Sequence, residues 1–272
     1  MKKLLIGALL ASFALSVIAP LAWVVLSSFK GSSEIWTSTW ALPSQLRLDN
    51  YTAAWREAGI GRAFFNSLWV CLGTLVILIP IGAMAAYVFA KYPFRGSKAL
   101  FGGFLGGLMF PHFLVIVPLY FLLDGMGMVD TKSGLILVYV AYSLAFTVFV
   151  LTAFFQALPG ELMEAAMIDG CGHARTFCKV MFPLAKPGLV VVGIFNAIGL
   201  WNEFGLALVL MPGAENRTLP LGIYDLAQVQ HYQADWGALF AGLVIVMLPV
   251  LAVYWAFRER IHDTMLAGAL KG

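Results

Sequence analysis

The sequence predicts an all-α membrane protein with six transmembrane helices. Of its 272 residues, 61% are hydrophobic and only 11% are charged, whereas soluble domains carry roughly 45–50% apolar and about 25% charged residues. The apolar residues form continuous runs rather than the alternating pattern of a membrane β-barrel, which leaves helices to satisfy the backbone in lipid. This composition excludes a soluble globule and a disordered chain. The net charge of +3, without a basic run, does not indicate a nucleic-acid partner.

Six runs are long enough to cross a bilayer, which takes roughly 20 mostly apolar residues. They cover residues 4–26, 64–90, 100–123, 134–155, 189–211 and 237–257 of a single domain, 1–272. The first run follows Lys2 and Lys3 and could be a secretory signal, but it is longer than the roughly 7–15-residue core of such signals. We therefore expect it to be retained as the first helix.

The basic residues predict the orientation, because cytoplasmic loops carry an excess of Lys and Arg. If both termini are cytoplasmic, 11 of the 17 basic residues fall in cytoplasmic segments and 6 outside. The short connection 91–99 carries three of the 11. This orientation leaves long outer loops at 27–63 and 212–236, and one long cytoplasmic loop at 156–188. Long loops in compact proteins often carry function.

The cytoplasmic loop 156–188 predicts a short helix after Pro159, which suits a helix start. Glu161 and Glu164 lie in its early turns, where the helix dipole favours anions, and Gly170 allows the chain to turn. A second amphipathic piece follows, and two prolines, at positions 183 and 187, are expected to interrupt it. By itself this pattern fits either docking to a partner protein or a surface helix that packs on the membrane or on the chain's own spans.

Three motifs in loop 156–188 resemble the EAA loop of bacterial ABC importer permeases. They are Glu164-Ala165-Ala166, Asp169-Gly170 and Phe182-Pro183-Leu184. The resemblance extends over nearly the whole chain and points to the shorter permease of the maltose-type carbohydrate uptake branch. It includes NY at 50–51, NSL at 66–68, YVFAKYPFRG at 87–96, PLY at 118–120, DT at 130–131, WNEF at 201–204 and the tail LAGALKG at 266–272, whose Leu266 replaces a threonine.

The resemblance implies a type I permease fold and a multi-pass subunit of the cytoplasmic (inner) membrane of a bacterium or archaeon. It implies three kinds of partner besides lipid: a second permease, two copies of an ABC ATPase and an extracytoplasmic sugar-binding protein. The loop would be the coupling helix seated in the ATPase, through Glu164, Ala165, Ala166, Asp169, Gly170 and Pro183. The tail would contact the ATPase through Gly268, Lys271 and Gly272. The outer loop would reach the binding protein through Arg217, Thr218, Leu219 and Pro220, unless it is an ordinary surface loop. A sugar or oligosaccharide is the expected substrate, with glycerol-phosphate-type polyols as the competing class.

Polar residues on the fifth predicted span are candidates for a translocation path or gate. Glu203 is the only formally charged residue inside a run, and Asn196 shares its helical face while Asn202 lies about 100° away. A carboxylate at membrane depth faces protein or water, so path lining and structural pairing both remain open.

An alternative is a stand-alone secondary transporter that uses Glu203 and His112. The sequence contains no Walker A motif and no recognisable catalytic or metal-ligating set. We therefore expect a transport subunit that is not an enzyme, without cofactor or metal, and with ATP bound by partner subunits.

Overall fold

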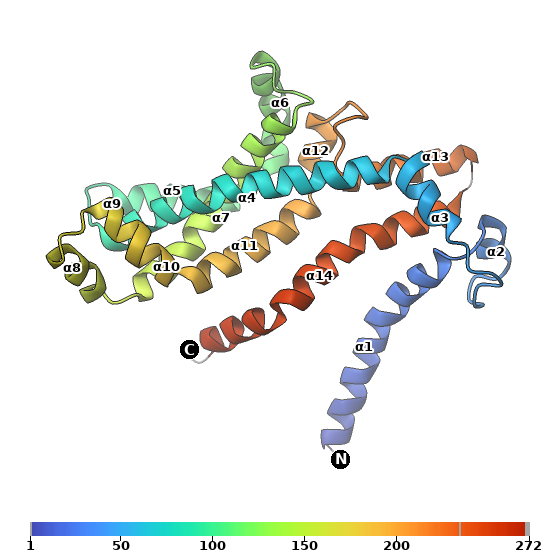
Figure 1. Cartoon of the computed structure of the whole chain (residues 1–272), viewed down its shortest axis with the longest axis horizontal. Coiled ribbons are helices and arrows are strands. Elements are labelled where there is room, and N and C mark those ends of the chain that lie inside the picture. Colours follow the sequence, from blue (N-terminus) through green and yellow to red (C-terminus); the bar gives the residue numbers. More distant parts are fainter. Residues whose placement is uncertain (1, 234, 270–272) are drawn as a thin grey trace. The chain divides into compact units, whose positions relative to one another are not determined.

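The computed structural model describes residues 2–233 and 235–269. For residues 112, 229–233 and 259–269 it describes the backbone only. All regular structure in this described part is helical (Figure 1). The chain forms two compact units, one made of Met1–Phe65 with Arg217–Ala252 and the other of Asn66–Asn216 with Val253–Gly272. Each is described by itself.

The first unit contains the N-terminal helix, the first outer loop and the start of the last helix. Its elements are α1 (Lys2–Ser27), α2 (Ser32–Thr37), α3 (Asp49–Thr52), the π-helix η1 (Ala53–Glu57), α13 (Leu219–Gln233) and the first part of α14 (Trp236–Ala269). Lys30 is buried after α1, and its Nζ donates to the carbonyls of Ser38 and Thr39 at 2.9 and 3.1 Å. The Asn50 side chain donates to two further carbonyls of this turn, so backbone carbonyls satisfy both the buried ammonium and the buried amide.

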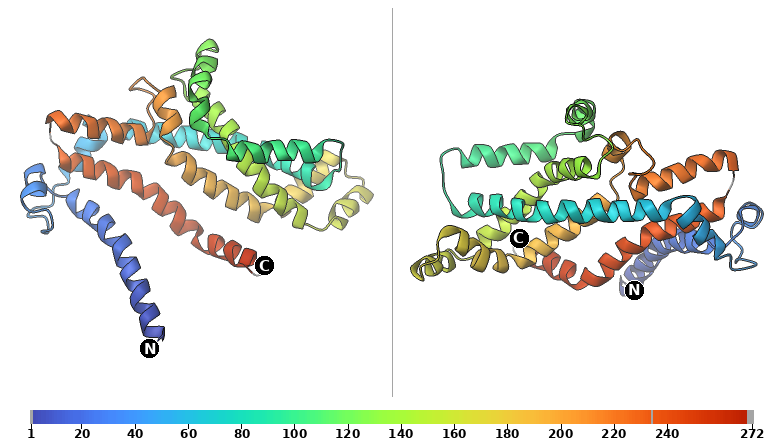
Figure 2. Two further views of the ribbon diagram at one scale, coloured as in Figure 1. Left: turned by 180° about the vertical axis from the view of Figure 1, so that it is seen from behind. Right: turned by 45° about the horizontal axis from the view of Figure 1, so that its top comes forward.

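The second unit is built around three long helices that share one core (Figures 1 and 2). It contains most of α4 (Ile60–Lys91), α5 (Ser97–Met109), the 3-10 helix η2 (His112–Val115), α6 (Ile116–Gly125), α7 (Lys132–Ala157), α8 (Glu161–Ile168), α9 (His173–Thr176), the π-helix η3 (Phe177–Met181), α10 (Phe182–Leu184), α11 (Lys186–Trp201) and α12 (Gly205–Leu210). Helix α7 packs against α5 and α11. Its Leu151 and Phe155 are fully buried beside Ala83 and Ala86 of α4 and Val192 of α11.

Four helices of the described part are long and apolar enough to span a membrane, or up to six if each of two bent pairs counts as one span. The four are α1, α4, α7 and α14, and they cover the predicted runs 4–26, 64–90, 134–155 and 237–257. The first bent pair covers the third run, and the second joins α9–α10 to α11.

The third predicted run, 100–123, is not one helix. Its segments α5 and η2–α6 meet at a bend of 90°, and Figure 1 shows α6 turned away from α5. The bend lies at Phe110 and Pro111, where Phe110 is extended with ψ 125°. A proline lacks the N–H that would continue the helix and disfavours the helical conformation in the residue before it.

The fifth predicted run, 189–211, is also divided, because α11 ends at Trp201 and α12 begins at Gly205. The predicted outer loop 212–236 is not irregular throughout, because it contains the 15-residue helix α13. Leu219 and Leu221 of that helix are almost fully buried. Burial of these apolar side chains stabilises a helix in a segment with many polar residues.

Candidate functional site

The loop 156–188 forms the predicted short helix, α8, from Glu161 to Ile168. Glu161 and Glu164 occupy its first turn, as the sequence predicts. Its C-terminus is closed by the N–H of Cys171, which donates to the Ala166 carbonyl at 2.9 Å, while Gly170 takes a φ of +79°. This pattern is a Schellman cap, which favours glycine at the left-handed position. The predicted turn at Gly170 is confirmed.

One face of α8 packs inward and the other is exposed. Ala166 is buried, and Met163 packs against the core shared by α4, α7 and α11. Glu164, Ala165, Asp169 and Gly170 are exposed, and Ile168 is 85% exposed beside them. The predicted ATPase contacts at this helix therefore fall into two groups. Four are exposed, whereas Ala166 packs against the inside of the protein.

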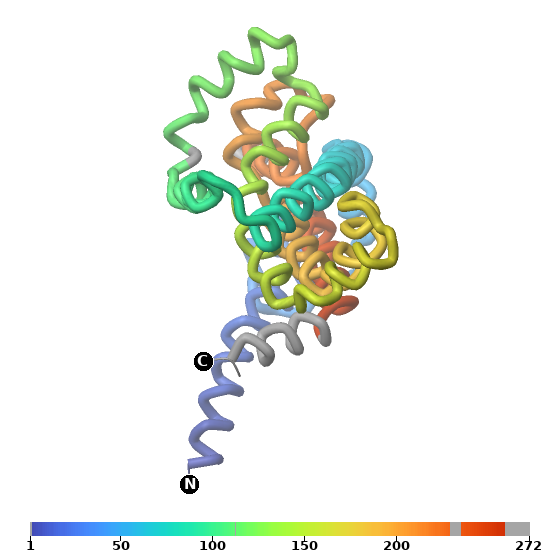
Figure 3. Tube along the Cα trace, turned by 90° about the vertical axis from the view of Figure 1, so that its left-hand side faces the viewer, coloured from blue at the N-terminus to red at the C-terminus, as the bar shows by residue number. Residues whose placement is uncertain are grey.

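The second half of loop 156–188 fixes α8 to the long helices. Helices α9, η3 and α10 follow in immediate succession, and the chain breaks at Ala185 with a bend of 73° before α11. The predicted break in helicity before the fifth span is present, at Ala185 between Pro183 and Pro187. Pro183 does not end a helix, because it lies in the first turn of α10. Pro183 itself is exposed. In Figure 3, which looks onto this end of the unit, the α8–α10 segment lies beside the end of α4.

Three contacts that the sequence did not reveal hold this segment. Met181 is fully buried in the core with Tyr87 and Phe155. The Tyr92 hydroxyl lies 2.9 Å from Nδ1 of His173, and Lys91 Nζ donates to the Leu158 carbonyl. Packed side chains and hydrogen bonds thus join the segment α8–α10 to the ends of α4 and α7.

A cavity of about 390 Å³ lies between α5, α7 and α11. Asn196, Gly199 and Leu200 of α11 line it together with Glu203, which lies just past the end of this helix. The helical period predicts these four residues on one face, and all four line the cavity although α11 ends at Trp201. The other walls come from Gly107, Leu108, Phe110, Tyr142, Ser143 and Phe146, with Phe195 beside Asn196. Hydrophobic side chains dominate, and a few polar groups from two helices meet inside. Such a cavity suits a small polar solute that is bound by hydrogen bonds.

Glu203 accepts hydrogen bonds from three donors at the break between α11 and α12. Its carboxylate accepts hydrogen bonds from the Tyr139 hydroxyl at 2.6 Å, the Leu206 N–H at 2.7 Å and the Ala207 N–H at 3.1 Å. The two N–H groups belong to the first turn of α12, which lacks intrahelical partners for them. Structural pairing, left open by the sequence, is therefore present, and the same residue also lines the cavity.

The other polar candidates differ in their surroundings. Asn196 is buried and donates to Thr147 Oγ1 and to the Val192 carbonyl, both at 3.0 Å. Asn202 is exposed, donates to the Ile198 carbonyl and does not line the cavity. The His112 side chain lies outside the described part. Among the described residues, no group of three or more His, Cys, Asp or Glu could hold a metal ion.

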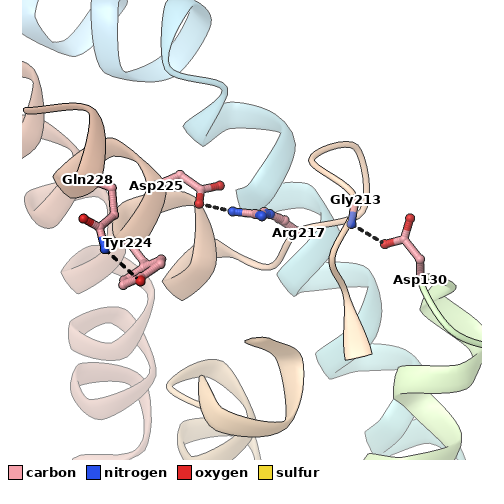
Figure 4. Close-up of polar contacts among 6 residues, drawn as sticks. All are labelled: Asp130, Gly213, Arg217, Tyr224, Asp225 and Gln228. Atoms are coloured by element: carbon pink, nitrogen blue, oxygen red, sulfur yellow. Dashed lines mark hydrogen bonds and ion pairs between the residues drawn. The ribbon is translucent and has the colours of Figure 1, made fainter. Parts of the chain in front are cut away.

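The predicted binding-protein contacts lie before and at the start of α13. Arg217 forms an ion pair with Asp225 (Figure 4). Thr218 and Leu219 are buried within the first unit, at 3% and 0% exposure, so their side chains are closed to a partner in this conformation. Arg217 and Pro220 remain partly accessible.

The segment just before these residues is tied to Asp130 in the second unit. The Asp130 carboxylate accepts from the Gly213 N–H at 3.1 Å (Figure 4), and its carbonyl accepts from the Asn216 side chain. Of the predicted tail contacts, Gly268 lies near the end of α14, and Lys271 and Gly272 lie outside the described residues.

Comparisons with known proteins agree on one class of membrane protein. The family described as "Binding-protein-dependent transport system inner membrane component" matches residues 78–261. The "Diacetylchitobiose uptake system permease protein NgcG" of Streptomyces coelicolor is 44% identical over 97% of this chain and 87% of that protein. The "Trehalose transport system permease protein SugB" of Mycobacterium tuberculosis is 34% identical over 93% of this chain and 92% of its own.

A solved structure shares the fold. It belongs to a bacterial ABC transporter involved in the import of the acidic polysaccharide alginate, with a TM-score of 0.79 and 20% identity over 94% of this chain and 95% of that one.

Proposed function

The chain belongs to the family of binding-protein-dependent transport system inner membrane components, and on that premise we propose that it couples ATP hydrolysis on separate subunits to sugar uptake through the exposed face of α8. It is a multi-pass permease subunit of an ABC importer. The alternative, a stand-alone secondary transporter, finds no support in its relatives.

The observation that carries the proposal is the two-sided arrangement of α8. Its outer face presents the small side chain of Ala165 between two acidic residues, Glu164 and Asp169, with Ile168 almost fully exposed. An exposed isoleucine beside small and charged residues suits the buried centre and polar rim of an interface. The inner face is packed on α4 and α7, so motion of an ATPase bound to α8 reaches the spans directly.

The partners follow from this role. A second permease completes the path, two ABC ATPases bind the nucleotide that this chain's sequence has no Walker A motif to hold, and an extracytoplasmic binding protein delivers the substrate. Loop 156–188 then faces the cytoplasm together with both termini. Arg217 and Pro220 contact the binding protein, and Gly268, Lys271 and Gly272 contact the ATPase.

The proposed substrate is a sugar, of di- or oligosaccharide size. Support comes from relatives whose names specify uptake of diacetylchitobiose and transport of trehalose. The cavity between α5, α7 and α11 forms part of the path, with Asn196 and Glu203 on its wall. Glu203 acts there as the residue that keeps the helix break in place. Asn202 does not line this cavity. If it lines the path, it does so from another part of the path.

A charge reversal on α8 tests the coupling. The variant Glu164→Lys is expected to insert normally but to lose co-purification of the ATPase and its stimulation by the loaded binding protein. The matched control is Glu57→Lys, also an exposed acidic residue, which lies in η1 on the proposed outer side and should retain both. Normal ATPase stimulation in Glu164→Lys would contradict the proposal. Calorimetry of the cognate binding protein against a panel with diacetylchitobiose, trehalose and a polyol would identify the substrate.

A further inference from the structure

A second cavity lies away from the polar cavity on α11, at the ends of α4 and α7 and the beginning of α5. Its volume is about 390 Å³. The connection between α4 and α5 supplies part of its lining, with Tyr92, Pro93 and Phe94. Lys91 is the last residue of α4, and Gln156 is the second-last of α7. Both helices are candidate spans, so the cavity lies at the ends of two spans, the level expected for a membrane surface.

The polar half of this cavity is basic. Lys91, Lys98, Ser97 and Gln156 line it, and none of its lining residues is acidic. Within the described part of the chain, the Lys98 ammonium has no hydrogen-bond or ion-pair partner. Ser97 and Lys98 are also the first two residues of the 13-residue helix α5, whose N-cap Gly96 offers no side-chain acceptor. Two cations and an uncapped helix start together favour an anion with several oxygen atoms.

The other half of the cavity is aromatic. Phe89, Phe94 and Phe101 line it, and the rings of Phe94 and Phe101 lie 6.1 and 5.6 Å from that of Phe89. Phe94 is 41% exposed. A soluble phosphate would leave this apolar surface uncovered, whereas an acyl chain would cover it.

We propose that this cavity binds an anionic phospholipid of the cytoplasmic leaflet, with the phosphate on Lys91 and Lys98 and an acyl chain on the phenylalanines. Basic pockets between helices on the cytoplasmic side of a membrane bind anionic headgroups in this way. The inference rests on the proposed function in one respect, that the connection 91–99 faces the cytoplasm.

The bound lipid touches residues that hold the segment α8–α10 to the long helices. Tyr92 lines the cavity and its hydroxyl contacts His173 of α9. Lys91 lines the cavity and donates to the Leu158 carbonyl, just before α8. An anionic headgroup on Lys91 therefore bears on the same contacts that fix α8 to the spans, and anionic lipid supports ATPase coupling.

Lipid retention tests the site without substrate or nucleotide. The assembled transporter is placed in nanodiscs of equimolar phosphatidylglycerol and phosphatidylcholine, released into detergent, and its retained lipids are identified by native mass spectrometry. The wild type is expected to retain phosphatidylglycerol selectively, and Lys98→Gln to retain it about fivefold less, the loss typical of one lysine at a membrane surface. Lys98→Arg should restore retention. Lys179→Gln, an exposed cation outside the cavity, is the matched control and should match the wild type.

Several outcomes would overturn the proposal. Equal retention in the wild type and Lys98→Gln would do so, as would an equal loss in Lys179→Gln. Displacement of the lipid by inorganic phosphate, with no effect of Phe94→Ser, would assign the site to a soluble anion instead. Selective retention in a transporter whose binding protein binds no sugar would leave the lipid site standing and count against the proposed function alone.

Discussion

The hydrogen bond between Tyr139 and Glu203 should stabilise the protein by about 1.5 kcal/mol. Hydrogen bonds to charged groups contribute about 1.5–3 kcal/mol, but hydrogen bonds between helices in membranes reach only about 1.7 kcal/mol at most. The two ranges overlap near 1.5 kcal/mol. The Tyr139 bond belongs at the upper end because it is only 2.6 Å long, ends on a carboxylate and comes from a side chain that is 1% exposed.

A double-mutant cycle measures this contribution. Tyr139→Phe removes the hydroxyl and leaves the ring. Glu203→Gln removes the charge and keeps one acceptor oxygen, whereas the N–H groups of Leu206 and Ala207 bond to different oxygens of Glu203. The free energy of unfolding in detergent is measured by denaturant titration for both variants and their combination. We expect Tyr139→Phe to cost about 1.5 kcal/mol and the pair to be non-additive by a comparable amount.

The control is Tyr254→Phe, a tyrosine of α14 that is 59% exposed. Exposed substitutions change stability by less than about 0.5 kcal/mol. If Tyr139→Phe is no more destabilising than this control, or if its effect adds fully to that of Glu203→Gln, the hydrogen bond does not hold the break between α11 and α12.

Three further results are expected. Gly170→Ala should destabilise loop 156–188 by about 1–2 kcal/mol, because its φ of +79° is unfavourable for a residue with a Cβ. The control Gly172→Ala, at φ −69°, should be nearly neutral in the same unfolding assay. Ile168→Asp should leave insertion intact and weaken ATPase co-purification, because this side chain is 85% exposed and apolar; unchanged co-purification would remove it from the interface. The Ser44 N–H donates to the exposed Glu34 carboxylate and holds its pKa below the ordinary value of 4.5. That stabilisation is present above pH 4.5 and lost as the pH falls through the lowered pKa. The difference in unfolding midpoint between wild type and Glu34→Gln should therefore shrink only in acid. A difference that persists in acid would refute the assignment.

Local signals predicted helix α8 well. A proline, two acidic residues and a glycine at fixed spacing determine where α8 begins and ends, and each acts through backbone conformation within a few residues. The face of α11 with Asn196 and Leu200 was also predictable, because it depends only on the period of the helix. Glu203 lines the same cavity from beyond the end of α11.

Long-range contacts explain what the sequence could not reveal. Tyr139 is 64 positions from Glu203, so no local pattern connects the carboxylate with its donor. Hydropathy averages over a whole run and therefore missed the break at Pro111. Helix α13 was missed because its stability comes from the burial of Leu219 and Leu221 in the fold, not from the composition of a polar loop.

The two helix breaks in the second unit adjoin the same cavity, and this bears on its role. Phe110, next to Pro111, and Glu203, in the link after α11, both line it. The breaks also approach each other closely, since a Cβ on Gly205 would lie 2.9 Å from the Phe113 ring. Irregular backbone at membrane depth is tolerated only where protein buries it or where it lines a water-filled cavity. Two unrelated segments that break at one cavity therefore support a hydrated path rather than a packing defect. The three donors on Glu203 hold one of these breaks in its present geometry.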